Sequence, residues 1–181
     1  MTNEPVTAEQ ITQLVVFIID RDEYAVAIDE VHEVVQTPHI TNVPGGQDFI
    51  IGVTNLRGKI IPVVSLEKVF RLERTIEAPA LHVIITEDSA GGLIGIQVDE
   101  VIEVIRITSE QLKPAPTIIA DKIGNDCTTG IIVIDGSDKT AETQRTILLL
   151  KLQKIVSTKL SAEMVEQTTS SVPSQIEGET A

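Results

Sequence analysis

The segment Gly52–Val64 reads GVTNLRGKIIPVV and decides the fold of this chain. Apolar residues on both sides of Arg57-Gly58 predict two β-strands joined by a tight turn, in which glycine supplies a positive φ angle. The pattern returns in distorted form in Gly130–Gly136, which reads GIIVIDG. Gly52, Leu56 and Gly58 correspond to Gly130, Ile134 and Gly136. Arg57 has no such counterpart, because Asp135 stands in its place. The glycines and the leucine therefore serve the backbone, and the arginine is an addition made in one copy.

A weaker repeat runs through the whole chain. The segment Asp29–Val34 matches Asp99–Val104 at an offset of 70 residues, the glycine segment matches at 78, and Leu66 matches Leu152 at 86. The offset grows only in loops, as expected for insertions between the strands of one repeated unit. A unit of roughly 70 residues with about five strands is too large for a solenoid and suits a small barrel. The repeat predicts two β-barrels packed side by side.

The composition of the 181 residues agrees with a β fold and excludes several functions. Hydrophobic residues make up 42% of the chain and are mostly Ile, Val and Leu, whereas aromatic residues make up only 2%. Dense β-branched residues favour strands, and so few rings leave little surface on which bases or sugars could stack. The formal net charge of −13 repels nucleic acid and anionic lipid, so we expect neither as a partner.

The cellular setting follows from two absences in the sequence. No apolar run approaches the roughly 20 residues that span a bilayer, so we expect no direct membrane insertion. Cys127 is the sole cysteine, so an internal disulfide cannot form. Both features predict a cytoplasmic protein.

The pattern along the chain predicts five regions. We expect a flexible arm over 1–12, a first barrel cycle over about 13–76 and a second over about 80–156, ending in a strand at Thr146–Ile155. A helix follows over 157–167, in which Ser161 can serve as an N-cap. The last residues, 168–181, are rich in Ser, Thr and Glu and should be disordered.

No catalytic or metal signature appears in the chain. The three histidines His32, His39 and His82 lack the spacing of a zinc site, and no phosphate-binding or nucleophile loop is present. We therefore predict no cofactor and no enzymatic activity. The carboxylates Asp29, Glu30 and Glu33 are repeated in the second cycle, which favours a solvated strand-and-turn pattern over one acid–base site. The rival hypothesis is an enzyme or small-ligand barrel that uses Asp29, Glu33 and Cys127.

Two surface features remain as candidates for binding. If the chain around Glu33 is extended, Val31, Glu33 and Val35 share one face, which is either a protein-contact patch or an ordinary barrel rim. The Arg57 guanidinium carries five donors in a rigid fork that fits a carboxylate or backbone carbonyls of a partner. Alternatively, Arg57 pairs within the chain, for example with Glu33.

These residues resemble a known family, the CheW coupling proteins of chemotaxis, from about Leu14 to Gln167. The residues that carry the resemblance are, in chain order, Phe17, Tyr24, Val31–Val34, Val43-Pro44, Phe49–Gly58, Ile61–Val63, Gly95, Val98-Asp99, Val104, Thr108–Glu110 and Leu112–Pro116. No single motif among them is decisive, but the ordered set is highly specific.

The resemblance implies an all-β fold of two SH3-like, five-stranded barrel subdomains, a CheW-like domain over about 13–156, with short helices that include one near the C-terminus. It also implies a non-catalytic scaffold that couples the cytoplasmic tip of methyl-accepting chemoreceptors to the regulatory domain of a CheA-type histidine kinase, at receptor arrays on the inner face of the membrane. Receptor binding is implied for Val31, Glu33 and Arg57, in the groove between the barrels. The kinase contact is implied at barrel ends, without assigned residues.

The chain departs from the family pattern near two leucines. The family often has an aspartate and a basic residue around the leucine after the hairpin, where this chain has Ser65 and Glu67, and the later segment reads Lys151–Gln153. These departures leave the fold intact and bear on the choice of partner. The same fold could also serve a twitching or developmental kinase pathway in place of a flagellar one.

Overall fold

The computed structural model describes residues 12–36, 38–77, 81–135 and 144–160, and strands dominate them. The strands are β1 (Thr12–Ile19), β2 (Asp22–Ala27), β3 (Glu33–Gln36), β4 (Ile50–Leu56), β5 (Lys59–Ser65), β6 (His82–Glu87), β7 (Leu93–Val98), β8 (Glu100–Ile107), β9 (Leu112–Lys113), β10 (Thr128–Ile134) and β11 (Arg145–Leu150). The helices are short: η1 (Ile28–Glu30), α1 (Leu66–Val69), η2 (Ser109–Gln111), α2 (Thr117–Ile123), η3 (Asn125–Cys127), α3 (Leu152–Lys154) and η5 (Ile155–Leu160).

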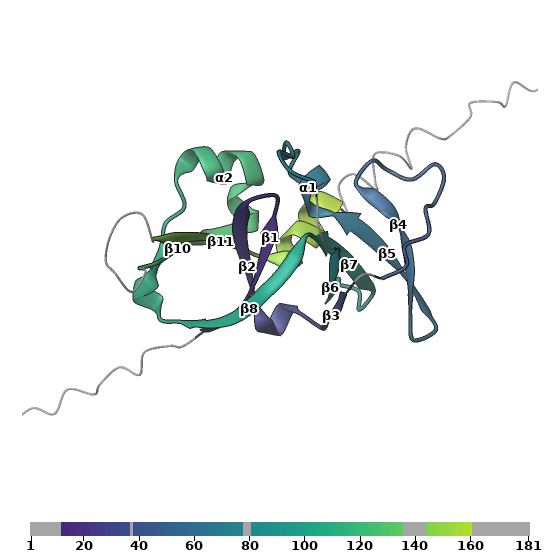
Figure 1. The fold of residues 1–181 in the computed structure, drawn as a ribbon, viewed down its shortest axis with the longest axis horizontal. Coiled ribbons are helices and arrows are strands. Elements are labelled where there is room, and N and C mark those ends of the chain that lie inside the picture. Colours follow the sequence, from purple (N-terminus) through teal and green to yellow (C-terminus); the bar gives the residue numbers. More distant parts are fainter. Residues whose placement is uncertain (1–11, 37, 78–80, 136–143, 161–181) are drawn as a thin grey trace, which may run out of the picture.

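The strands form two sheets that lie side by side (Figure 1). Sheet A has the order β8-β1-β2-β11-β10-β9, and sheet B has the order β3-β6-β7-β5-β4. The two β subdomains predicted from the sequence are thus present, and the two-residue strand β9 gives sheet A a sixth member. The yellow-green helical segment formed by α3 and η5 lies between the sheets in Figure 1.

The expected division into a first cycle of about 13–76 and a second of about 80–156 does not match the sheets. The hairpin β1–β2 of the first cycle pairs with β8 and β11, and the hairpin β6–β7 of the second cycle pairs with β3 and β5. Each sheet therefore contains one hairpin from the other cycle. A sequence repeat reports which strands are alike, but it does not report which copy a strand pairs with.

Strands that correspond in the repeat have corresponding neighbours, although at the offset of 70 residues their registers differ by one residue. Glu33 lies opposite Ile85 on β6, and its counterpart Glu103 lies opposite Val16 on β1. In the parallel pairs, β5 runs beside β7 in sheet B as β11 runs beside β2 in sheet A. The two sheets are thus built on one plan, with an internal pseudo-twofold relation between them.

The main core lies between the sheets and draws on both. It contains Val15, Phe17, Ile19, Tyr24 and Val26 from sheet A, Val64, Ile84, Ile96 and Val98 from sheet B, and Leu66, Leu152, Ile155 and Val156 from the helices. The Phe17 and Tyr24 rings stack with centroids 5.9 Å apart. Burial, with a smaller contribution from Asp22, raises the pKa of the Tyr24 hydroxyl to about 12. Because both cycles supply this core, the two sheets are expected to fold as one unit.

The two repeated glycines sit at equivalent bulges. The register shifts between Ile50 and Gly52 in β4, and between Thr128 and Gly130 in β10. A Cβ atom on Gly52 would lie 2.3 Å from the Thr41 carbonyl oxygen, and one on Gly130 would lie 2.4 Å from the Lys113 carbonyl oxygen. Both glycines therefore allow a neighbouring chain segment to approach closely, which confirms that they serve the backbone.

The C-terminal part differs from the prediction. Strand β11 ends at Leu150, five residues before the predicted end at Ile155, and helical structure begins at Leu152 instead of 157. Leu152 and Ile155 fall within the predicted strand, but together with Val156 they are spaced like one face of a helix and are buried in the main core. Of the expected arm over 1–12, Thr12 begins strand β1, and the other residues lie outside the described part of the chain. The rest of the expected helix after residue 160 and the tail over 168–181 also lie outside it.

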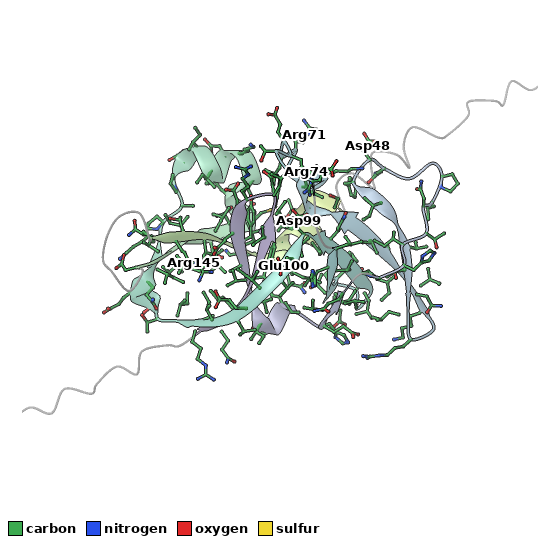
Figure 2. All side chains as sticks on the ribbon, in the orientation of Figure 1. Asp48, Arg71, Arg74, Asp99, Glu100 and Arg145 are labelled. Atoms are coloured by element: carbon green, nitrogen blue, oxygen red, sulfur yellow. The ribbon has the colours of Figure 1, made fainter. Side chains whose placement is uncertain are left out.

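Four of the repeated carboxylates, Glu30, Glu33, Asp99 and Glu103, make hydrogen bonds in the structure, which corrects the sequence interpretation for these four, whereas Asp29 and Glu100 are exposed as expected. Asp99 is buried, and its carboxylate accepts hydrogen bonds from Arg74 at 2.8 and 3.0 Å and from the Asp20 main-chain N–H at 2.7 Å. Asp20 in turn accepts from the Thr75 hydroxyl and from the N–H groups of Thr75 and Ile76, which lowers the pKa of the Asp20 carboxyl. Figure 2 shows Arg74 and Asp99 near the middle of the molecule. This network holds the segment after α1 against the β1–β2 turn.

Candidate functional site

The candidate site forms where Glu33 on β3 meets Arg57 at the tip of the β4–β5 hairpin. Leu56 pairs with Lys59, so the turn contains only Arg57 and Gly58, with φ angles of 50° and 84°. Two consecutive positive φ angles define a type I′ turn, which matches the twist of a hairpin. The Gly58 N–H donates to Asn55 Oδ1 at 2.8 Å and stabilises the turn.

Arg57 occupies a backbone position that its residue type disfavours. The first central residue of a type I′ turn is best filled by Asn, Asp or Gly, and other L-residues cost about 1–2 kcal/mol there. The corresponding position in the second copy is an aspartate, Asp135. A positive φ angle at a non-glycine residue marks Arg57 as a candidate position, as it also does Asp20 and Arg71.

The Arg57 guanidinium reaches across to β3. Its Nη2 donates to Glu33 Oε2 at 3.0 Å, so the internal pair considered from the sequence is present. The Arg57 side chain nevertheless remains 79% exposed, whereas that of Glu33 is 23% exposed. An exposed pair of this kind contributes little to stability, and most of the five donors of Arg57 still face solvent.

Val31, Glu33 and Val35 lie on the half-buried face of the chain, as predicted, while His32, Val34 and Gln36 face outward. Val31 packs against the main core, and Val35 packs against a smaller cluster within sheet B that includes Ile61 and Val63. Val31 thus offers only part of its surface to a partner. The structure brings Glu33 and Arg57 into contact. Val31 lies two positions before Glu33 in the chain, on the same face.

The equivalent carboxylate in sheet A is paired with a different arginine. Glu103, the counterpart of Glu33, also accepts from an arginine, but this is Arg145 on β11, at 2.7 Å. Arg145 has more partners than Arg57, because its Nε and Nη2 also donate to Glu23 at 2.7–3.1 Å. These carboxylates raise the pKa of Arg145 above its ordinary value. The arginine of sheet A thus joins two carboxylates and is 37% exposed, whereas Arg57 pairs with one carboxylate and is 79% exposed.

The rival site is not assembled. Cys127 is 1% exposed within the main core, Asp29 is exposed, and the Glu33 carboxylate pairs with Arg57. Among the residues that the structure describes, no group of three or more His, Cys, Asp or Glu side chains could hold a metal ion. Within the same residues, no helix is both long enough and apolar enough to cross a bilayer.

The departures near the two leucines have structural explanations. Ser65 is the N-cap of α1, and its hydroxyl accepts from the Lys68 N–H at 3.4 Å, as an aspartate would. Glu67 accepts from Arg74, the same arginine that holds Asp99. No sequence pattern singles out Arg74, because its partners Glu67 and Asp99 come together only in the folded chain.

Comparisons with known proteins agree with this description. The family model of the CheW-like domain matches residues 13–160. The chemotaxis protein CheW of Thermotoga maritima is 34% identical over 140 residues, which cover 77% of this chain and 84% of that protein. The chemotaxis protein CheW of Klebsiella aerogenes is 29% identical over 145 residues, covering 80% of this chain and 81% of that protein.

A solved structure extends the likeness to the fold. The crystal structure of the scaffolding protein TtCheW from Thermoanaerobacter tengcongensis superposes with a TM-score of 0.67 at 32% identity, over 85% of this chain and 93% of that one. The family is one of non-catalytic chemotaxis scaffolds, so the prediction of an adaptor without enzymatic activity is confirmed by membership. The sequence, the two-sheet fold and the solved relative agree, and the chain belongs to the CheW-like family.

Proposed function

We propose that this protein couples chemoreceptors to a CheA-type histidine kinase, and that Val31, Glu33 and Arg57 bind the cytoplasmic tip of a methyl-accepting receptor. The observation that carries the proposal is Arg57. It is a strained, 79% exposed arginine with a single described ion pair, at a turn where the second copy has aspartate. Family membership supplies the scaffold role that this surface would serve.

The chemistry of the site fits an amphipathic helix of the receptor. An acidic side chain of the helix can use the open donors of Arg57, and the Glu33 carboxylate can accept from a polar or basic one. Val31 supplies apolar surface next to this pair. Charged contacts of this kind set register and orientation, while the apolar contact supplies burial.

The kinase contact requires a second surface on the same molecule. Large apolar side chains are exposed away from Glu33 and Val31: Ile118 on α2 is 80% exposed and Val104 on β8 is 52% exposed. Exposed apolar side chains on α2 and on β8 of sheet A support a protein contact on this subdomain. The partner implied by the family resemblance is the regulatory domain of the kinase, and the protein would act in the cytoplasm at receptor arrays.

The test is calorimetry with two partners from the same genome, a soluble fragment of a chemoreceptor tip and the regulatory domain of the CheA-type kinase. Arg57→Ala and Glu33→Ala should each weaken receptor binding about tenfold while leaving kinase binding unchanged. The melting temperature should hardly move, because an exposed ion pair contributes at most about 1 kcal/mol and alanine keeps the same backbone strain at position 57. Arg71→Ala is the matched control, because Arg71 is also an exposed arginine with a positive φ angle and lies outside both proposed contacts.

Two results would contradict the proposal. Absence of binding to both partners would remove the coupling function, and a large loss of stability in Arg57→Ala would show that the arginine is structural. A ligand screen that raised the melting temperature by several degrees with a small molecule would favour the rival small-ligand barrel.

A further inference from the structure

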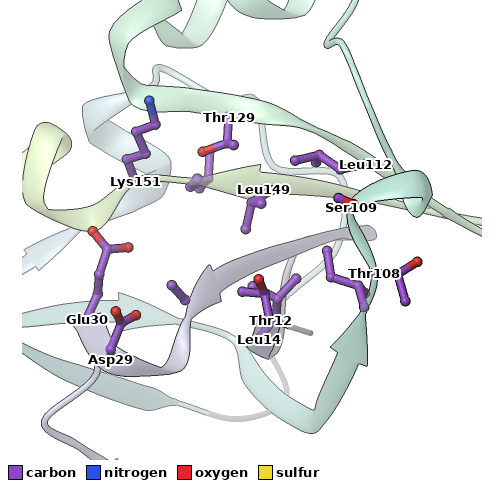
Figure 3. Close-up of a pocket in the computed structure, with 13 residues that line it drawn as sticks. Thr12, Leu14, Asp29, Glu30, Thr108, Ser109, Leu112, Thr129, Leu149 and Lys151 are labelled. Carbon is purple, nitrogen blue, oxygen red and sulfur yellow. The ribbon is translucent and has the colours of Figure 1, made fainter. Parts of the chain in front are cut away.

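The helical segment formed by α3 and η5 begins with a cap from a distant part of the chain. The N–H groups of Leu152 and Gln153 donate to Oε2 and Oε1 of Glu30 at 3.2 and 3.1 Å. The first N–H groups of a helix have no partner within the helix, and a carboxylate is a favourable acceptor for them. Figure 3 shows the Glu30 carboxylate directed toward this end of the yellow-green ribbon.

The cap comes from Glu30 because the helix lacks one of its own. In α1, the equivalent helix, Ser65 at the N-cap accepts from Lys68 N–H. The corresponding N-cap position of α3 holds Lys151, which makes no side-chain cap, since a lysine side chain has no acceptor atom. Comparison of the two copies shows that the side-chain cap provided by Ser65 in α1 is absent at Lys151 in α3. Glu30 supplies the missing acceptor atoms.

Glu30 is also held at its main chain, directly before Val31. Its carbonyl oxygen accepts from the Thr86 hydroxyl at 2.8 Å, and Thr86 is completely buried. Two residues on, the His32 N–H donates to the Ile85 carbonyl at 2.7 Å, where β3 joins β6. The chain from Glu30 to Glu33 therefore runs without interruption from the helix cap to the candidate site.

Packing alone does not hold η1 in place. None of its three residues is buried, and Ile28 is 39% exposed. Its neighbours Ala27 and Val31 pack against apolar clusters, and the polar contacts of Glu30 add links from η1 itself to Thr86, Leu152 and Gln153.

We infer that Glu30 is a positioning residue for receptor binding: by tying η1 to the start of the segment Leu152–Leu160, it fixes the orientation of Val31 and Glu33. The inference rests on the proposed function. Glu30 need not touch the receptor, and its effect passes through Val31 and Glu33.

The experiment separates tethering from helix stability. Glu30→Ala removes both the link between η1 and α3 and the cap of α3. The double variant Glu30→Ala with Lys151→Ser gives α3 the type of N-cap that α1 has, but it does not restore the link to η1. Affinity for the soluble receptor-tip fragment is measured by calorimetry, and hydrogen exchange is followed by mass spectrometry over residues 28–36 and 152–160. Glu100→Ala, at the exposed counterpart of Glu30, is the control for loss of one negative charge.

We expect Glu30→Ala to lower receptor affinity roughly threefold to tenfold and to speed exchange in both segments. The double variant should regain the melting temperature and the protection of 152–160, while affinity stays low and 28–36 stays fast. If Glu30→Ala does not fold, Glu30→Gln, which keeps the length but only one acceptor oxygen, should show the same changes to a smaller degree.

Four results would overturn the inference. In the first, the double variant recovers affinity together with stability, so that Glu30 acts only through the helix. In the second, Glu30→Ala or its Gln substitute keeps wild-type affinity while Arg57→Ala loses it, and the proposed receptor site then stands without this residue. In the third, Glu100→Ala lowers affinity equally. If neither Arg57→Ala nor Glu30→Ala changes affinity, the receptor site itself is wrong and the inference falls with it.

Discussion

Three arginines of this protein show how surroundings decide what one residue type does. Arg145 is closed between Glu23 and Glu103, and Arg74 lies between Glu67 and Asp99. Arg57 has one described partner and stays 79% exposed. The first two each join two carboxylates, whereas most of the donors of Arg57 face solvent.

Arg74→Ala should be strongly destabilising, in contrast to Arg57→Ala. The Asp99 side chain is 5% exposed, and without the arginine its carboxylate remains charged, buried and poorly paired. Removing one partner of a buried ion pair costs about 3 kcal/mol or more. Urea unfolding of the two variants beside wild type measures the difference.

Equal stability of Arg74→Ala and Arg71→Ala would show that the Asp99 network contributes nothing. Asp99→Asn combined with Arg74→Ala is the second check, because removing the charge should recover part of the loss.

At this scale the sequence predicts some residues and cannot predict others. Arg57 could be singled out because the second copy has Asp135 in its place, and the candidate pair with Glu33 followed from a short list of acidic residues. Glu30 could not, because its hydrogen bonds join it to residues more than 120 positions away. The carboxylate pattern looked like ordinary solvated turns until the folded chain supplied those partners.

At the scale of elements, the bulged hairpins β4–β5 and β10–β11 carry the repeat. Gly52 and Gly130 do the same work in both, since each lets a carbonyl group approach where a side chain would collide. Gly58 differs, because a Cβ atom there would meet nothing within 4 Å, and only its φ angle of 84° favours glycine.

Alanine substitutions should therefore rank in a set order. Gly52→Ala combines a backbone collision with a φ angle of 148° and should cost about 3 kcal/mol or more. Gly130→Ala meets only the collision and should cost about 2 kcal/mol, and Gly58→Ala only the strain, about 1 kcal/mol. Thermal unfolding of the three variants measures the order, and a loss at Gly58 as large as that at Gly52 would refute the close-approach explanation.

Elements with a clear alternating pattern were predictable, and those set by context were not. The strands around the two hairpins lie within a few residues of their predicted bounds. The helix α2 after Pro116 was missed, because its seven residues are too few to show a helical period. The end of β11 was misplaced because a run of Leu and Ile suits a strand and a buried helix equally well.

At the scale of the whole molecule, the exchange of hairpins makes the two cycles depend on one another. A cut between residues 77 and 81 leaves β1–β2 without β8 and β11, and leaves β3, β4 and β5 without β6–β7. The sequence repeat alone predicted two consecutive barrels, for which the same cut would fall in a harmless linker.

Residues 1–77 expressed alone should therefore be unfolded, and co-expression with 81–181 should restore a folded complex. Copurification of a tagged half and the amide spectrum of the complex are the measurements. A well-dispersed spectrum from 1–77 alone would show that the exchanged pairing is dispensable.

The exchange of hairpins also affects the order in which the strands can pair during synthesis on the ribosome. All strands of sheet B lie between residues 33 and 98, so they can pair while the rest of the chain is still being made. Hairpin β1–β2 emerges first, yet its parallel partner β11 begins only at Arg145. Until β11 has been synthesised, the apolar side chains of β1–β2 lack this partner strand. Contacts between residues so far apart in the sequence also form slowly. The earliest strands to be synthesised are thus among the last to be buried.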